Sequence, residues 1–545
     1  MTTIQLTDKV DALFTTWDRP DSPGCALGVI QHGQLVYKRG YGMANLEHGI
    51  PISSNTAFRI GSTSKQFTDM SVALLAEQGK ISLDDNIRHY LPEMPEYEHP
   101  ITIRHLIHHT SGLRDYLELM TLAGMRDDDF YTNDQVIEMV ARQKGLNFAP
   151  GTKYLYSNSG YYLLGVIVER ASGQSLRQFA GQNIFEPLGM KNTHFHDDHN
   201  EIVMNRAAGY SPQDIEGYRI DMTTLDMVGD GGVFTTVEDL LLWDQNFYRN
   251  KLGKGDQDLI RQILTPGTLN NGEPLEYAFG LMVSDYKGLK MVSHGGAFVG
   301  FRAEMIRFPQ RELSVICLAN LSTFNPSRLA RQVADIYLAD QPEAGWKEDP
   351  AGSAFIELPE KELQDKVGVY QGSSSGTIVE LEVQEGKLMA KISDHSFQLA
   401  PISSLDFQVL DAPLDIKITF EKSGLGEPWQ AHLSIEGERP DILSAIQIVS
   451  PSVDQLAEYA GDYYSDELQV TYKLVVEDDK LYLRHPNTPP NPFKPGLSDM
   501  FYMSDMFNVS DISLYFIRNE GTKISGFVMN GGRAKNIPFQ KMRRE

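Results

Sequence analysis

The last third of this 545-residue sequence repeats itself, and the repeat limits what that part of the chain can fold into. Two pairs of segments are similar: LQDKVGVYQG (363–372) with LAEYAGDYYS (456–465), and EGKLMAKI (385–392) with DDKLYLRH (478–485). Both pairs have one offset, since Gly461 lies 93 residues after Gly368 and Lys480 lies 93 residues after Lys387. Short alternating runs separated by turns surround them, which is typical of antiparallel sandwiches or barrels. We therefore predict two copies of one β module.

The first 340 residues have a different pattern, in which strands enclose a helical region. CALGVIQ and QLVYKR flank the short turn His32-Gly33 and predict a hairpin over residues 25–39. Helix-like segments continue to about residue 250, and strand character returns over 277–320, before a helix at about 326–339. This order predicts an α+β domain whose antiparallel sheet is assembled from both ends of the domain.

These patterns predict the domain organisation. The α+β domain covers 1–340, a linker covers 341–357, and the two β modules cover 358–450 and 451–545. The linker is predicted from QPEAGWKEDPAGSAFIE, which is rich in proline, glycine and charge.

The net charge of −24 argues against nucleic acid or an anionic membrane surface as a partner. No apolar run is long enough to span a bilayer, and MTTIQLTDKVDALFTTW at the N-terminus has the pattern of an amphipathic helix rather than of a signal peptide. The simplest expected location is the cytoplasm. Cys25 and Cys317 lie in apolar, strand-like runs, where we expect buried free thiols.

A Ser-x-x-Lys motif, Ser62 to Lys65, precedes an apolar helical pattern over residues 67–75. The pattern predicts a helix from Ser62 to near Gly79. Residues i and i+3 share a helix face, so the Ser62 hydroxyl and the Lys65 amine are expected to be neighbours. A lysine whose pKa is lowered by burial or by cationic neighbours can take the proton of a serine and make it a nucleophile. The alternative is an N-capping serine beside a solvated lysine.

A Tyr-x-Asn motif, Tyr156 to Asn158, follows a Pro-Gly turn and precedes the apolar helical segment YYLLGVIVER. The phenol can relay a proton, and the amide can hold a substrate amide. The same triplet occurs at 131–133 and 248–250, where we expect an N-cap at Asn133 and a helix exit, respectively. The alternative for Tyr156 is a tyrosine packed on a helix start.

The third motif, His294-Gly295-Gly296, lies between the strand-like segments KMVS and AFVGFRAEM. Consecutive glycines let a substrate backbone approach closely, and the N–H groups of a strand can bind an extended substrate as an added strand. The alternative is a hairpin turn with a surface histidine.

The order of these three motifs resembles the serine β-lactamases and penicillin-binding proteins, whose third motif is Lys-Thr-Gly or a variant of it. Four further segments resemble the class C and esterase branch: ITIRHLIHHTSGL, PGTKYLYSNSGYYLLG, EPLGMKNTHF and GDGGVFTTVEDLLLW. Within that branch, the His-x-Gly motif and two C-terminal β domains are most similar to the D-aminopeptidases, as are HTSGLRDY (109–116) and YYSDEL (463–468).

The resemblance implies a fold and a nucleophile. The fold is α+β, with a β-lactamase/transpeptidase-like catalytic domain (an antiparallel sheet flanked by helices, plus a helical subdomain) followed by two small lipocalin-like barrels. Ser62 would be acylated, and Lys65 and Tyr156 would share general-base and general-acid work. The N–H groups of Ser62 and Ala297 would form the oxyanion hole.

The resemblance also implies a substrate-binding set. Asn158 would orient the substrate amide, and Gly295 and Gly296 would line the substrate site. His294 would replace the family's lysine as a partner of the substrate and of Tyr156. No metal and no cofactor are implied.

The sequence departs from this family pattern at two places. A histidine at the third motif is mostly neutral at pH 7 unless a partner raises its pKa, so we expect weaker selection for a free C-terminal carboxylate in the substrate. In D-aminopeptidases a loop from the final barrel limits substrate size. Here residues 506–527 leave little room for such a loop, and the only long candidate is HPNTPPNPFKPG at 485–496. Restriction to short substrates is therefore in doubt.

Two histidine-rich segments outside the motifs have the density of metal ligands. One contains His105 and His109, which are i and i+4, and the other contains His194, His196 and His199. We expect structural roles for both, although the i,i+4 pair could geometrically hold a metal. In the second segment, the family resemblance accounts for the flanking residues without a metal, and no glutamate follows at the spacing of the zinc-helix signature.

The sequence therefore predicts a serine hydrolase that works through an acyl-enzyme, in first place a D-stereospecific aminopeptidase that acts on short peptides or amides. Alternatives of the same fold are a carboxylesterase and a weak β-lactamase. The alternative from another class is a non-hydrolytic penicillin-binding or ligand-binding protein. The expected partner is a small molecule or short peptide, with a homodimer as a further candidate.

Overall fold

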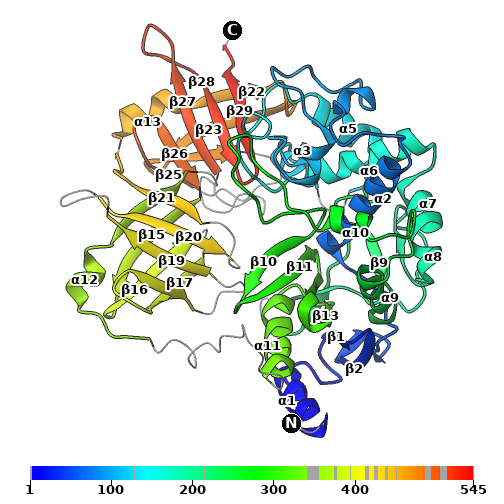
Figure 1. The fold of residues 1–545 in the computed structure, drawn as a ribbon. Coiled ribbons are helices and arrows are strands. Elements are labelled where there is room, and N and C mark those ends of the chain that lie inside the picture. Colours follow the sequence, from blue (N-terminus) through cyan, green and yellow to red (C-terminus); the bar gives the residue numbers. More distant parts are fainter. Residues whose placement is uncertain are drawn as a thin grey trace. The chain divides into compact units, whose positions relative to one another are not determined.

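The two ends of the first 340 residues form one antiparallel sheet in the computed structural model (Figure 1). The strand order is β10-β11-β12-β13-β1-β2. The bounds are Cys25–Gln31 (β1), Gln34–Tyr41 (β2), Met282–Tyr286 (β10), Leu289–Phe298 (β11), Phe301–Phe308 (β12) and Leu313–Ala319 (β13). The predicted assembly of the sheet from both ends is confirmed, although the returning strands begin at Met282 rather than at residue 277.

The structure describes most of the chain. The described residues are 3–126, 129–213, 216–339, 355–373, 377–392, 395–410, 416–422, 428–435, 440–449, 451–484, 492–503 and 512–543. The predicted linker over 341–357 lies outside them except for its last three residues. The candidate loop at 485–496 lies outside them up to residue 491, and Pro492–Pro495 forms strand β25.

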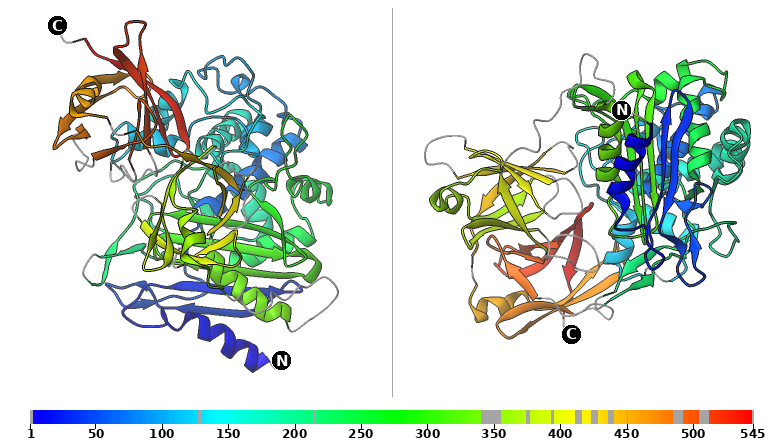
Figure 2. Two further views of the ribbon diagram at one scale, coloured as in Figure 1. Left: turned by 90° about the vertical axis from the view of Figure 1, so that its left-hand side faces the viewer. Right: turned by 90° about the horizontal axis from the view of Figure 1, so that it is seen from below.

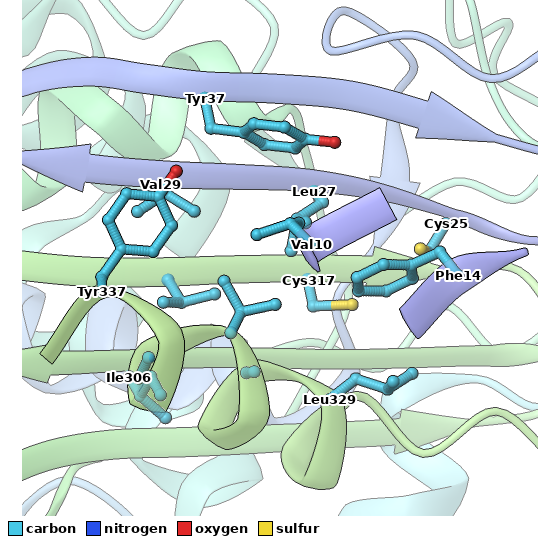
Figure 3. Close-up of a cluster of buried hydrophobic side chains, with 14 of the residues drawn as sticks. Val10, Phe14, Cys25, Leu27, Val29, Tyr37, Ile306, Cys317, Leu329 and Tyr337 are labelled. Atoms are coloured by element: carbon cyan, nitrogen blue, oxygen red, sulfur yellow. The ribbon is translucent and has the colours of Figure 1, made fainter. Parts of the chain in front are cut away.

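Helices cover both faces of the sheet. On one face, α1 (Thr3–Phe14) lies beside α11 (Pro326–Ala339), as both views in Figure 2 show. Their apolar side chains pack onto the strands in one large cluster, in which Cys25 and Cys317 are buried free thiols (Figure 3). On the other face, α9 (Val237–Tyr248) contacts β1 and β13. The predicted N-terminal amphipathic helix and the predicted helix at about 326–339 are both confirmed.

The helical region lies between β2 and β10 in the sequence. Its main helices are α2 (Lys65–Glu77), α3 (Ile103–Ile107), α4 (Tyr116–Leu122), α5 (Asn133–Ala141), α6 (Asn158–Ser172), α7 (Leu176–Ala180) and α10 (Asp258–Ile263). The predicted N-cap at Asn133 is wrong by one residue, because the Thr132 hydroxyl accepts the Gln135 N–H at 3.3 Å. None of the helices in the described part of the chain is long and apolar enough to cross a membrane.

The chain divides into two compact units, and the division does not follow the sequence order. Unit 1 comprises Met1–Leu113, Asp127–Ile137 and Phe148–Glu348. Unit 2 comprises Arg114–Arg126, Glu138–Asn147 and Asp349–Glu545. Two segments of the helical region therefore belong with the C-terminal barrels.

Unit 2 contains two closed antiparallel barrels of eight strands each. The strands of the first are Gly368–Gly372, Ile378–Gln384, Lys387–Ile392, His395–Pro401, Asp406–Val409, Ile416–Glu421, Gln430–Ile435 and Asp441–Ile446 (β14 to β21). Those of the second are Gly461–Ser465, Val470–Glu477, Lys480–Arg484, Pro492–Pro495, Met500–Met503, Ile512–Arg518, Ile524–Gly531 and Ala534–Lys541 (β22 to β29). A short helix precedes each barrel, α12 (Glu360–Gln364) and α13 (Val453–Tyr459). The prediction of two copies of one β module is confirmed.

The second barrel binds the two early segments through buried polar side chains. Arg114, which is 2% exposed, forms an ion pair with Glu467 and donates to Gln143 at 2.8 Å. Arg114 also donates to the backbone carbonyl groups of Lys535 and Asn536, at 2.7 and 2.6 Å. The segments HTSGLRDY and YYSDEL, which both resemble D-aminopeptidases, are thus joined by the contact between Arg114 and Glu467.

Candidate active site

Ser62 lies in a single 3₁₀ turn, Gly61–Ser64, and the α-helix α2 begins only at Lys65. The predicted helix start at Ser62 is therefore three residues too early. A 3₁₀ turn at a helix N-terminus is common, and its residues i and i+3 eclipse one another, so Ser62 and Lys65 still share a face. Lys65 Nζ lies 3.0 Å from Ser62 Oγ, as the motif predicts.

Lys65 is fully buried, and its amine is held by fixed acceptors. Nζ donates to Asn158 Oδ1 at 2.8 Å and to the Asp230 carbonyl oxygen at 2.6 Å. These two oxygens accept hydrogen bonds and cannot donate them. Nζ also contacts Ser62 Oγ, so a neutral Lys65 amine is within reach of the proton of the Ser62 hydroxyl.

Tyr156 and Asn158 flank the start of α6, as the sequence predicts. Asn158 is the first residue of α6, and its side-chain oxygen reaches Lys65. The Tyr156 ring is partly exposed, and its centroid lies 4.8 Å from Lys65 Nζ. His109 supports this segment, because its Nδ1 lies 3.0 Å from the Ser157 N–H nitrogen and its ring packs on Tyr156 at a centroid distance of 4.2 Å.

His294 is in the middle of β11, not in a hairpin turn, and it is 6% exposed. Its Nε2 lies 2.9 Å from the Tyr277 hydroxyl, and its Nδ1 lies 2.6 Å from the Gly295 carbonyl oxygen. Burial, and then the nearby positive charge of Lys65, lower the pKa of His294 to about 3. The imidazole is therefore neutral at pH 7, and both of its nitrogens are hydrogen-bonded within the protein.

The glycines of the third motif have a packing role that the sequence did not indicate. A Cβ added at Gly296 would lie 1.9 Å from the Ile60 carbonyl oxygen, and one added at Gly295 would lie 3.1 Å from Glu304 Oε2. The absence of a side chain at Gly296 therefore lets β11 pack directly on the turn that carries Ser62. The expectation that the glycine pair opens space for a substrate backbone needs correction, since at Gly296 that space is filled by the protein itself.

The edge of β11 next to Ser62 is only partly paired. β10 pairs with β11 from Leu289 to Ser293, so the run from His294 to Phe298 extends beyond it. Ala297 lies in this run, and a Cβ added at Gly61 would be 2.8 Å from the Ala297 nitrogen. The backbone of Ala297 is thus beside the Ser62 turn, where the family resemblance implies one of the two oxyanion-hole donors.

A buried set of tyrosines and one carboxyl lies behind the site. Tyr161 donates to Asp69 at 2.5 Å and accepts the Gly280 N–H at 3.0 Å. The hydroxyl groups of Tyr161 and Tyr277 also interact, which continues the network to His294. Burial raises the pKa of Asp69 well above its usual range. The hydrogen bond from Tyr161 and the positive charge of Lys65, one helical turn earlier on α2, oppose this shift.

The structure thus brings five of the predicted residues together: Ser62, Lys65, Tyr156, Asn158 and His294. Sequence reasoning missed the roles of His109, Asp230 and Tyr277. For His109, the sequence pattern indicates only an i,i+4 pair with His105. It lies beyond the end of α3 with a φ of 56°, so it shares no helical face with His105.

Comparisons with known proteins show which family the chain resembles. The Beta-lactamase family model matches residues 10–339. The chain is 30% identical over 461 residues to a D-aminopeptidase of Brucella melitensis, an alignment that covers 84% of this chain and 82% of the relative. It is 33% identical over 305 residues to penicillin-binding protein 4* of Bacillus subtilis, which covers 53% of this chain and 66% of that protein.

Solved structures show the same fold. The octameric penicillin-binding protein homologue from Pyrococcus abyssi superposes with a TM-score of 0.56 at 24% sequence identity. The match covers 82% of this chain and all of that one.

Proposed function

We propose that this chain, which belongs to the beta-lactamase family of serine hydrolases, hydrolyses short D-configured peptides or amides. The reaction passes through an acyl-enzyme on Ser62. The observation that carries the proposal is the 3.0 Å contact between Ser62 Oγ and a buried Lys65 amine that also donates to Asn158 Oδ1 and to the Asp230 carbonyl oxygen. The D-aminopeptidase relative, which aligns over 84% of this chain, supports the choice of substrate class.

The proposed reaction has two halves. Lys65 takes the Ser62 proton while Oγ attacks the substrate carbonyl carbon, and the Ser62 and Ala297 N–H groups stabilise the oxyanion. The C–N bond then breaks, and the leaving amine receives a proton from the Lys65–Tyr156 pair. Water hydrolyses the ester on Ser62, releasing the acid product and restoring the serine hydroxyl. Lys65 and Tyr156 act as one coupled acid–base pair, because the Tyr156 ring centroid lies 4.8 Å from Lys65 Nζ.

The neutral His294 favours amides, or peptides cleaved at their N-terminus, over substrates with a free C-terminal carboxylate. A permanent lysine cation at this position would pair with such a carboxylate, whereas His294 is uncharged and hydrogen-bonded to Tyr277. Ester hydrolysis is the second candidate, favoured by the partly exposed Ser62 and Tyr156.

The test is a matched assay of D-Ala-p-nitroanilide, L-Ala-p-nitroanilide and p-nitrophenyl acetate with the unmodified chain and Ser62→Ala. We expect cleavage of the D-amide over the L-amide, reduced by roughly 10³-fold or more in Ser62→Ala. Ester cleavage alone would move the assignment to a carboxylesterase. A stable penicilloyl adduct on Ser62 by mass spectrometry, without turnover of any substrate, would support a penicillin-binding protein instead. Full activity of Ser62→Ala would exclude the proposed nucleophile.

A further inference from the structure

A cluster of metal-ligating side chains lies outside the Ser62 site, on the small sheet β5-β9-β6. The strands are Phe58–Arg59 (β5), His194–Phe195 (β6) and Val233–Thr235 (β9). His194 and His196 are two residues apart on an extended segment, so both imidazoles are on the same side of the chain. Their ring centroids are 5.6 Å apart.

The side chain of Glu201 reaches both rings. Glu201 Oε2 lies 3.9 Å from His194 Nε2 and 3.7 Å from His196 Nδ1. These distances are too long for hydrogen bonds. Both nitrogens are buried and have no hydrogen-bond partner within the described structure, and the His196 side chain is 3% exposed. Buried polar atoms are rarely left unpaired in folded proteins, so two at one place require an explanation.

The carboxylate in this cluster is held in position. Arg177 binds both oxygens of Glu201, at 2.6 and 2.7 Å, and also contacts Asp197 at 2.9 Å. These hydrogen bonds lower the pKa of Glu201. A carboxylate oxygen has lone pairs for an arginine and for a metal together, and hydrogen bonds of this kind orient metal ligands. The carboxylates of Asp197 and Glu201 and the guanidinium of Arg177 together carry one net negative charge.

Two further charges oppose a cation here. They are the positive charges of the Arg59 and Arg206 guanidinium groups, which act on His196. We expect the positive charge of the two arginines to make binding weaker than in a site without them.

We propose that His194, His196 and Glu201 bind a divalent transition-metal ion of the zinc class. Two imidazoles and one carboxylate are a donor set that zinc accepts, with water in the fourth position. Donors of a tetrahedral zinc ion are roughly 3.4 Å apart. The three donor atoms here lie within 4.8 Å of one another, so small side-chain movements suffice.

Binding at this site would stabilise the segment behind Lys65. The His196 N–H donates to the Gly232 carbonyl oxygen at 2.8 Å. Asp230, two residues earlier, is the residue whose carbonyl oxygen accepts a hydrogen bond from Lys65. The inferred role is therefore structural, and no step of the hydrolysis passes through the metal.

The experiment is a calorimetric titration of the full-length, chelator-treated chain with Zn²⁺, together with Co²⁺ absorption spectra and thermal unfolding. We expect one ion per chain, a visible Co²⁺ ligand-field band and a melting temperature that rises with zinc concentration. His196→Phe keeps a ring of similar size, and Glu201→Gln keeps an acceptor for Arg177. Each should weaken binding at least tenfold.

His199→Ala is the matched control. His199 belongs to the same segment, but its Nδ1 lies 2.9 Å from Asp226 and it is not one of the three proposed ligands. Its removal should leave zinc binding unchanged. The proposal is overturned if the chain takes up no zinc, if binding is the same in Glu201→Gln, or if His199→Ala abolishes it. Because Glu201→Gln preserves shape, it decides the outcome even if His196→Phe does not fold.

Discussion

The two barrels of unit 2 have the same strand order, but their side chains contact different residues of the chain. Tyr370 in the first barrel donates to the Lys366 carbonyl oxygen at 3.0 Å, and Tyr463, 93 residues later, donates to the Tyr459 carbonyl oxygen at 2.7 Å. The same structural hydrogen bond is therefore present in both copies.

The copies differ at residues that point to partners. Val379 is buried in the apolar core of the first barrel, whereas its counterpart Tyr472 donates to the Leu122 carbonyl oxygen in the segment 114–126. Glu467 of the second barrel binds Arg114 in the same segment. The comparison shows that both copies of a duplicated module can keep the same tyrosine-to-carbonyl hydrogen bond. One copy has, in addition, side chains that bind a distant part of the chain.

The largest expected effect comes from breaking the buried ion pair of the second barrel. Arg114→Ala leaves Glu467, which is 4% exposed, as an uncompensated buried charge. We expect a loss of about 3–5 kcal/mol in the free energy of unfolding, measured by urea denaturation. The double variant Arg114→Ala/Glu467→Ala should lose less than the two single variants together, because it removes both charges.

The control for this prediction lies next to Glu467 in the sequence. Lys144 and Asp466 form an exposed ion pair at 2.7 Å. Lys144→Ala should have no measurable effect, because exposed pairs contribute little. If Arg114→Ala changed the free energy of unfolding as little as Lys144→Ala, the stability of the second barrel would not depend on the buried ion pair between Arg114 and Glu467.

Lowering the pH should destabilise unit 1 before the barrels of unit 2, and this difference sharpens the comparison between the two units. Burial lowers the pKa of His108 to about 4 and that of His294 to about 3, below the unfolded value of roughly 6.5. The unfolded chain then binds protons that the folded chain does not, so stability falls as the pH drops below about 6.5. Each imidazole should cost about 2 kcal/mol between pH 7 and pH 5.

His108→Asn tests this acid effect. The amide of the introduced asparagine can replace the contact of His108 Nδ1 with the Tyr277 carbonyl oxygen, 3.1 Å away, but the amide does not titrate. The difference in unfolding free energy between pH 7 and pH 5 should shrink by about 2 kcal/mol. An unchanged difference would mean that His108 is protonated equally in both states.

The smallest expected effects test the equivalence of the two barrels. Tyr370→Phe and Tyr463→Phe each remove one hydroxyl that binds a backbone carbonyl oxygen. Each should cost about 1 kcal/mol, with the two values equal within about 0.5 kcal/mol. Thermal denaturation of both variants gives the comparison. A clearly larger cost in one barrel would show that the repeated bond does not contribute equally.

Much of the fold was predictable because it follows from local patterns. The hairpin at His32-Gly33, the sheet built from both ends of the first domain and the repeated β module all rest on alternation, turns and internal similarity. The helix start at Ser62 was wrong, since a 3₁₀ turn and an α-helix share the same i,i+3 neighbours and the sequence pattern does not separate them.

The sequence by itself determined the proximity of Ser62 to Lys65, because spacing within one turn fixes which side chains share a face. Only the tertiary structure decided what holds Lys65, why Gly296 is a glycine and which side chain binds His294. Lys65 binds Asp230, which lies 165 residues away, and Gly296 packs on Ile60, more than two hundred residues away. His294 binds Tyr277, which is only 17 residues away but lies outside β11. Contacts of this kind depend on how elements pack, and no local periodicity records them. The pairing of Arg114 with Glu467 has the same cause, since 353 residues separate the two partners along the chain.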